Sequence, residues 1–227
     1  MSAAQLELAA SVLGPLTDEV VFLGGATVGL WRSDPAARAP RVTLDVDVAA
    51  EVFSLAGYER FQERLRAQGL EEDRESGVLC RWRDAQSDLV LDVVPIESRL
   101  AGIDDRWLAD AVVQPRTVDL PSGTSIRAVG PAWLLVLKLQ AFADRGEDDA
   151  LASRDFEDLI LLVDGRRELH DEVAALPDHA REFIQREIER VQALPSFDYV
   201  VEGALATPVA RARAQEVTVP RLQRLGS

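Results

Sequence analysis

The sequence predicts a mixed α/β protein of the α+β kind, with a sheet-containing part over residues 1–129 and a helical part over residues 130–227. Two observations predict this division. Before Pro131, short runs rich in β-branched residues alternate with helical patterns and with turns that contain glycine or proline. After Pro131, apolar residues recur three and four positions apart, which is the helical period. With 227 residues, the chain can bury a substantial core.

The elements of the first part follow from local patterns. Helix formers with helical spacing over residues 3–13 stop at Gly14 and Pro15, so a helix is expected to open the chain. The run 20–23 stops at a glycine pair and leads into residues 27–31, which predicts a strand, a tight turn and a helix. The further expected elements are, in order, a loop over 33–40, a strand over 41–48, a helix over 54–68, strands over 77–82 and 88–95, and extended stretches over 112–120 and 125–128.

The second part is expected to form amphipathic helices separated by glycine, proline or acidic loops. Their ranges are 133–143, 153–163, 168–176 and 180–194. The tail from Thr207 is poorly patterned, so we expect it to fray or to be held by a partner.

The charged residues of the chain are unusual in number and kind. The chain has 25 basic and 39 acidic residues, a net charge of −14, and Lys138 is its one lysine beside 24 arginines. Such a charge repels polyanions, which disfavours a general nucleic-acid coat protein or a binder of anionic membranes. Most of the acid excess lies after residue 146 and is expected to be solvated helix surface. If RNA is bound, the candidate basic surface is either the set of arginines at 211, 213, 221 and 224 or a local cleft.

Nothing in the sequence predicts export or a membrane span. Cys80 is the single cysteine, so an intramolecular disulfide is excluded, and we expect it to be a small strand residue without a chemical role. The longest uncharged run, residues 20–31, is interrupted by three glycines and is shorter than the roughly 20 apolar residues that a bilayer span needs. No signal-peptide pattern opens the chain. We therefore expect a cytoplasmic protein that does not bind membranes.

Three aspartates form a candidate metal site. Residues 41–48 alternate polar and apolar side chains, which places Asp45 and Asp47 on one face of a strand. Asp92 interrupts the apolar run 89–94, where a carboxylate costs several kcal/mol unless it is paired or bound to a metal. If the two strands are neighbours, the three carboxylates lie within about 4–6 Å, and protons or a metal must neutralise them. Oxygen ligands favour Mg²⁺ or Mn²⁺, although the first two aspartates alone also fit a solvated strand face.

Gly24 and Gly25 lie between a predicted strand and a predicted helix. Backbone amides and the positive end of a helix can hold a phosphate at such a turn, and glycine permits close approach of the ligand. Ala26 follows the pair, and a hydroxyl group arrives at Thr27. The glycine pair alone also fits a plain turn, so its functional interpretation depends on its order relative to the aspartates.

The order of these features resembles the polymerase-beta-like nucleotidyltransferase superfamily, with a strand, the glycine pair, a helix, the stretch Arg41-x-Thr43-x-Asp45-x-Asp47, and then Asp92. Two later stretches narrow the resemblance to the AbiEii/AbiGii-type nucleotidyltransferase toxins. These stretches are Leu135-x-x-Lys138-Leu139 and Ser153-x-Asp155-x-x-Asp158. The resemblance covers roughly residues 20–165.

The resemblance implies a metal-dependent enzyme that transfers a nucleoside monophosphate from a nucleoside triphosphate to an acceptor hydroxyl, on an RNA end or a protein side chain. It implies a catalytic site that binds Mg²⁺ or Mn²⁺ through Asp45, Asp47 and Asp92. It also implies a nucleotide site, completed by the helical part, whose members are Gly24, Gly25, Thr27, Lys138 and Asp155. The chain would then be the toxin of a toxin–antitoxin pair, with an antitoxin as its partner. The alternative is a catalytically degenerate module of the same fold that binds a nucleotide or a protein.

Lys138 and the two later acids also have plainer interpretations. A lysine on an amphipathic helix is ordinarily solvated, whereas a compact ammonium suits a phosphate where a guanidinium does not fit. Asp155 fits the nucleotide site and equally the first turn of a helix that Ser153 caps. Asp158 is expected to pair with an arginine such as Arg154 or to hold the helix face in place.

Overall fold

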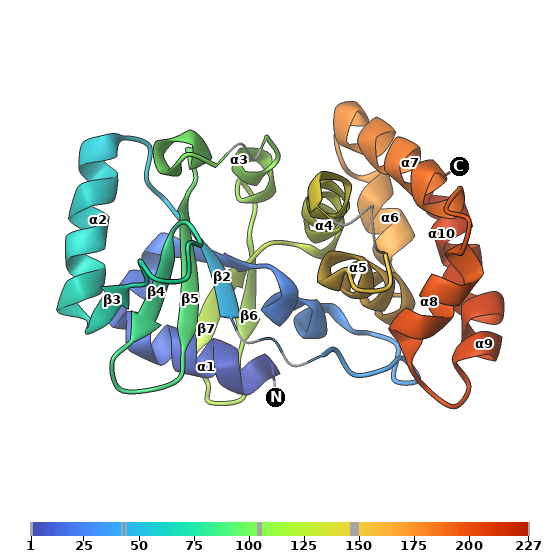
Figure 1. Ribbon diagram of the computed structural model, residues 1–227, viewed down its shortest axis with the longest axis horizontal. Coiled ribbons are helices and arrows are strands. Elements are labelled where there is room, and N and C mark those ends of the chain that lie inside the picture. The colour runs from blue at the N-terminus through green and yellow to red at the C-terminus, as the bar shows by residue number, and fades with distance from the viewer. Residues whose placement is uncertain (1, 42, 44, 104–105, 146–149, 227) are drawn as a thin grey trace. The chain divides into compact units, whose positions relative to one another are not determined.

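The computed structural model describes residues 2–41, 43, 45–103, 106–145 and 150–226. The chain forms two compact units (Figure 1). Unit 1 comprises residues 1–30 and 41–130, and unit 2 comprises residues 31–40 and 131–227. The predicted mixed α/β class is confirmed, because the described part of unit 1 holds a mixed sheet and that of unit 2 is helical.

Seven strands form one sheet in the described part of unit 1. In their order across the sheet they are β3 (Leu70–Glu72), β4 (Arg81–Asp84), β5 (Val90–Pro95), β2 (Asp45–Ala50), β1 (Val20–Leu23), β7 (Ser125–Ala128) and β6 (Arg116–Asp119). The pairs β2–β5 and β1–β7 are parallel, and the other neighbours are antiparallel. This order places β2, which begins at a candidate aspartate, between β5 and β1.

Alternation along the central strands separates a core face from a polar face. On the core face, two residues of each strand are fully buried: Val46 and Val48 of β2, and Leu91 and Val93 of β5. The residues between them point to the opposite face, because successive side chains of a strand alternate. The candidate aspartates of both strands therefore lie on that opposite face.

The helices of unit 1 include two that were expected, near residues 3–13 and 54–68. The helices are α1 (Ser2–Leu13), α2 (Leu55–Ala67), α3 (Leu108–Ala111), and 3₁₀ helices over Gly14–Glu19, Gly25–Trp31 and Ser98–Ala101. Ser54 caps α2, since its hydroxyl accepts a hydrogen bond of 3.2 Å from the amide of Gly57. The stripe that α2 buries consists of Tyr58, Phe61 and Leu65, which are spaced at the helical period.

Unit 2 consists of packed helices. They are α4 (Pro131–Arg145), α5 (Arg154–Gly165), α6 (Leu169–Ala174), α7 (Asp178–Gln192), α8 (Phe197–Leu205), α9 (Ala210–Arg213), a π-helical turn over Ala214–Thr218, and α10 (Val219–Leu225). The Phe142 ring of α4 packs against the Phe156 ring of α5, with centroids 5.1 Å apart. Among the described residues, no helix has both the length and the apolar character needed to cross a bilayer.

The structure corrects two of the expected elements of unit 1. The segment expected to be a helix over residues 27–31 is a 3₁₀ helix that starts at Gly25. The strand expected over residues 77–82 begins only at Arg81. Gly77 and Cys80 have φ angles of +69° and +63°, which are left-handed and form a turn rather than a strand. Cys80 is therefore a turn residue, and its role as a strand residue was wrongly predicted.

The C-terminal tail does not fray. From Thr207 the chain continues through α9, the π-helical turn and α10. Ala214, Thr218, Leu222 and Leu225 are buried at intervals of three and four residues, so the tail packs into unit 2 along one face. The expectation of a frayed tail was wrong because its apolar positions are separated by arginine and glutamine, which hides the helical period in the sequence.

Candidate functional site

Three aspartates line one face of the sheet in unit 1. Asp47 of β2 is the register partner of Asp92 of β5, and the two strands run parallel. Neighbouring strands lie about 5 Å apart, so these two carboxylates start from adjacent positions. Asp45 lies two residues before Asp47 and shares its face of the strand. We call Asp45, Asp47 and Asp92 the aspartate trio.

Arg81 of β4 binds two members of the aspartate trio. Its register partner is Asp92, whose two oxygens accept hydrogen bonds from Nε at 2.8 Å and from Nη2 at 2.7 Å. The same Nη2 also donates to Oδ2 of Asp45 at 3.0 Å. Oxygens of two carboxylates therefore lie less than about 6 Å apart, across one guanidinium nitrogen.

The aspartate trio and Arg81 form a charge cluster that is only partly exposed to solvent. The side chains of Arg81 and Asp92 are 18% and 13% exposed. The hydrogen bonds to Asp92 raise the pKa of Arg81 above its ordinary value, and the charges of Asp45 and Asp47 add to this effect. In this conformation, no three His, Cys, Asp or Glu side chains of the described chain converge closely enough to hold a metal ion. The carboxylates of Asp45 and Asp92 contact Arg81 instead.

The glycine turn touches the aspartate trio directly. Leu23, the last residue of β1, is the register partner of Asp47, and Gly24 follows it with a φ angle of +74°. A Cβ atom on Gly24 would lie 1.8 Å from Oδ2 of Asp47. Only glycine fits, because the backbone is left-handed and the carboxylate lies against the α-carbon.

Thr27 supports this turn from inside the protein. Its side chain is fully buried, and its hydroxyl donates a hydrogen bond of 2.9 Å to the carbonyl of Gly24. The amide of Thr27 donates to the same carbonyl at 3.2 Å. In this structure Thr27 therefore fixes the shape of the turn, whereas the resemblance implied a contact with the nucleotide.

Replacing Gly24 by alanine tests the close contact with Asp47. We expect a loss of about 2–4 kcal/mol in the free energy of unfolding, from the left-handed backbone and from the displaced carboxylate. Gly77→Ala is the matched control, because Gly77 also has a left-handed φ, but a Cβ atom added there would meet no atom of the described residues within 4 Å beyond its chain neighbours. Urea unfolding of both variants measures the difference. Equal losses would show that the contact with Asp47 contributes nothing.

Lys138 belongs to a buried ion-pair cluster in unit 2. Its ammonium lies 3.0 Å from Oδ1 of Asp155 and 2.7 Å from Oδ2 of Asp158. Lys138 is 8% exposed and Asp158 is 1% exposed, so the interpretation of Lys138 as a solvated lysine is wrong. Asp158 contacts Lys138, where a pairing with an arginine such as Arg154 had been predicted. The cluster joins α4 to α5.

Asp155 receives a second cation. Nη2 of Arg145 lies 2.8 Å from Oδ2 of Asp155. Burial raises the pKa of Asp155, but Lys138 and Arg145 outweigh burial and hold this pKa below its ordinary value. Ser153 caps α5 by accepting a hydrogen bond from the amide of Phe156, so Asp155 also occupies the first turn of a helix. The structure thus confirms the interpretation of Asp155 as a first-turn residue of a capped helix, and its part in a nucleotide site stays a prediction.

The predicted site residues are divided between the two units. The glycine turn and the aspartate trio belong to unit 1, and Lys138 and Asp155 belong to unit 2. Sequence reasoning missed Arg81. The signal that could have found it is its position in a short strand-like run, Arg81-Trp82-Arg83, that alternates charged and apolar residues before the strand of Asp92.

Two arginines of the expected basic surface are committed to internal contacts. Arg213 contacts both oxygens of the fully buried Asp164, at 2.8 and 2.9 Å from its Nε. Arg213 and Arg221 also reach Oδ2 of Asp34, at 3.1 and 3.2 Å. Arg167 binds the other oxygen of Asp34 at 3.0 Å. These arginines bind acids of unit 2, so the tail offers much less basic surface than its sequence suggests.

The expectation of a solvated acid surface after residue 146 is likewise only partly right. Asp155, Asp158, Asp164 and Glu187 are buried. Each of them contacts lysine or arginine, as buried carboxylates generally do.

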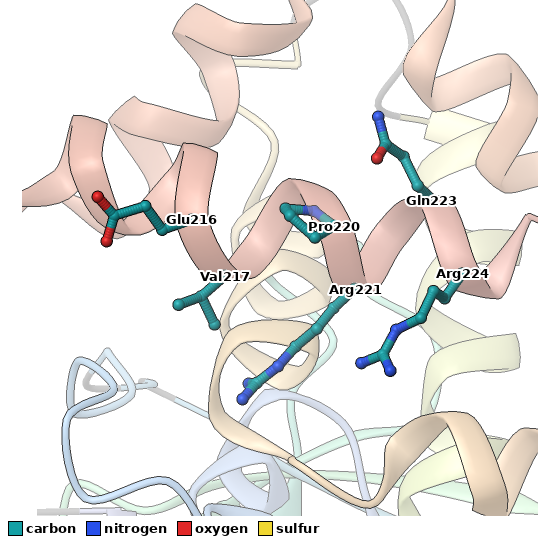
Figure 2. A pocket seen from close by; sticks show the side chains of 6 residues that line it. All are labelled: Glu216, Val217, Pro220, Arg221, Gln223 and Arg224. Atoms are coloured by element: carbon teal, nitrogen blue, oxygen red, sulfur yellow. The ribbon is translucent and has the colours of Figure 1, made fainter.

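A depression of about 630 Å³ lies along the C-terminal helix of unit 2 (Figure 2). Its lining residues are Glu216, Val217, Pro220, Arg221, Gln223 and Arg224. None of the predicted site residues lines it, and the guanidinium of Arg221 contacts Asp34. We assign no ligand to this depression.

A scan against known protein-family models and a search of curated proteins found no match to this chain. The function is therefore inferred from the residues and their geometry.

Proposed function

We propose that this chain is a metal-dependent nucleotidyltransferase, which transfers a nucleoside monophosphate from a nucleoside triphosphate to an acceptor hydroxyl. The observation that carries the proposal is the register of β2 and β5, which sets Asp47 beside Asp92 with Asp45 on the same face. The contact of Gly24 with Asp47 supports it. The turn that would hold phosphates thereby adjoins a carboxylate that would hold the metal.

The aspartate trio suits a hard divalent cation. Its donors are all carboxylate oxygens, which Mg²⁺ and Mn²⁺ prefer. One positive group, the guanidinium of Arg81, already contacts Asp45 and Asp92 together, and this supports a cation position between them. When bound, two divalent cations would neutralise the triphosphate and the charge that develops during transfer.

The residues of the chain would position the reactants and accept a proton. In the proposed reaction the acceptor oxygen bonds to the α-phosphorus, the bond to the leaving pyrophosphate breaks, and Asp92 accepts the hydroxyl proton. The backbone amides at Gly25 would face the phosphates. Because Arg81 donates two hydrogen bonds to Asp92, Arg81 has to move before Asp92 can accept that proton.

In this proposal, Lys138 would act indirectly, by binding the carboxylates of Asp155 and Asp158. Its ammonium contacts Asp155 and Asp158, and a direct contact with a phosphate would require it to leave one of them. We therefore assign Lys138 the role of holding the carboxylates of Asp155 and Asp158 in fixed orientations within unit 2.

Replacing Asp47 by asparagine tests the proposed activity. The purified protein is incubated with α-labelled triphosphates, Mg²⁺, and either tRNA or a cell lysate, and label in RNA and protein is measured. We expect transfer by the wild type and only background label with Asp47→Asn, because the change removes a metal-binding charge while keeping the side-chain shape. Asp88→Asn, at an exposed position just before β5, should keep full activity. Labelling that survives in Asp47→Asn would remove the assignment.

The contacts of Arg81 favour one alternative function, a degenerate module that binds a nucleotide or a protein without catalysis. A guanidinium held permanently against Asp45 and Asp92 would replace the metal. Calorimetric titration with a triphosphate separates the two functions. An active site should bind the triphosphate much more tightly with Mg²⁺ than without it, whereas a degenerate nucleotide module should bind equally in both conditions.

The charge distribution favours an acceptor hydroxyl on a protein over one on RNA. The net charge is −14, and Arg213 and Arg221 of the tail contact buried acids. Little of the candidate basic surface is thus left to attract a polyanion. An antitoxin partner and a cytoplasmic location stay predictions from the sequence.

A further inference from the structure

Arg81 lies where a cation of the aspartate trio would lie. It uses Nε and Nη2 to contact both oxygens of Asp92, and Nη2 to contact one oxygen of Asp45. The guanidinium thus contacts both oxygens of one carboxylate and one oxygen of a second. A metal ion that binds these same oxygens would need the position that the guanidinium occupies. The metal ion and the guanidinium therefore cannot be bound there at the same time.

We propose that Arg81 is a displaceable counter-ion, which occupies the aspartate trio in the metal-free protein and lowers its affinity for divalent cations until one displaces it. The proposal rests on the proposed function, because it assumes that the aspartate trio binds a metal. It adds a role for Arg81, which sequence reasoning did not identify. Arg81 would set the metal concentration at which the site fills.

The local structure favours displacement of the side chain without movement of the strand. The backbone at the start of β4 is anchored, because the carbonyl of Cys80 accepts a hydrogen bond of 2.9 Å from the amide of Val93. The hydroxyl of Tyr58 donates to Sγ of Cys80 at 3.2 Å. The Arg81 side chain is partly exposed and long, so it can rotate toward solvent while its backbone stays in the sheet.

Competition of this kind has a definite thermodynamic consequence. If the site can bind a metal only when the guanidinium has left, the apparent dissociation constant rises by the inverse of the fraction of molecules in that open state. Removal of the guanidinium should remove this penalty. A purely structural salt bridge would instead leave metal affinity unchanged and lower only stability.

Titration with Mn²⁺, followed by the loss of the electron paramagnetic resonance signal of the free ion, tests the proposal without requiring activity. We expect Arg81→Gln to bind Mn²⁺ at least about tenfold more tightly than the wild type. Arg81→Lys should be intermediate, since an ammonium cannot bind a carboxylate through two nitrogens. Arg83→Gln is the matched control, because Arg83 lies on the same strand but contacts Asp73, which is outside the aspartate trio, and the net charge changes equally.

The outcomes separate this proposal from the proposed function. Affinity of Arg81→Gln within about twofold of the wild type, or an equal gain in Arg83→Gln, overturns the role of Arg81 and leaves the metal site standing. If neither the wild type nor Arg81→Gln binds Mn²⁺ at a site that Asp47→Asn abolishes, the proposed function fails as well. Melting curves give a second readout: Mn²⁺ should raise the Tm of Arg81→Gln more than that of the wild type.

Discussion

Replacing Asp164 by asparagine is expected to lower the free energy of unfolding by about 3–5 kcal/mol, because it removes the charge from a buried ion pair and leaves the guanidinium of Arg213 uncompensated. Asp164 is completely buried at the end of α5. Both of its oxygens contact Arg213, and one accepts a hydrogen bond of 2.8 Å from Thr218. A carboxylate near the C-terminus of a helix meets the negative end of the helix dipole, so these partners are needed to hold it there.

The variant should affect the C-terminal segment first. Arg213 and Thr218 both reach Asp164 from this segment, and Arg221 donates to the backbone carbonyl of the same residue. Asp171→Asn is the matched control, since Asp171 is also an acid of unit 2 but its side chain is 91% exposed. Urea unfolding followed by circular dichroism measures both variants. A loss below about 1 kcal/mol for Asp164→Asn would show that apolar contacts alone hold the C-terminal segment in unit 2.

The sequence predicted the regular elements whose signals are local. The strand over residues 20–23 stops at a glycine pair, and α2 starts at the capping residue Ser54, so bounds and residue patterns agree. β3 and α3 were missed because they have three and four residues, which is too few for any period to show. The turn that includes Cys80 was missed because a left-handed φ at a residue other than glycine carries no sequence signal.

The candidate site was predictable in part for the same reason. The period of two placed Asp45 and Asp47 on one face, and the cost of burying a charge identified Asp92. The sequence did not predict that β4 lies beside β5, on the side away from β2. Pairing across a sheet depends on the whole topology. Arg81 reaches the aspartate trio only through that pairing, so its contacts appear only in the structure.

Lys138→Met is expected to cost about 3–5 kcal/mol of stability, because it removes the ammonium that contacts two buried carboxylates while it keeps most of the apolar stem. The pKa of Asp155 is held below its ordinary value by Lys138 and Arg145 against the effect of burial. Its ionisation therefore stabilises the wild type above the ordinary pKa of an aspartate, and this stabilisation is lost as the pH falls through the lowered value. The variant should lose less stability than the wild type between neutral pH and about pH 3.

A double variant separates the ion pairs from the packing around Lys138. Adding Asp158→Leu to Lys138→Met replaces a buried charge and its partner by apolar side chains, so the double variant should be more stable than Lys138→Met alone. Arg145→Met is the control for the exposed cation, whose side chain is 70% exposed, and should cost less than about 1 kcal/mol. Urea unfolding at neutral pH compares these variants and the wild type with Asp158→Leu alone, which completes the double-mutant cycle. Additive losses would mean that Lys138 and Asp158 are not coupled, and the contribution of Lys138 to stability would then have to come from its contact with Asp155.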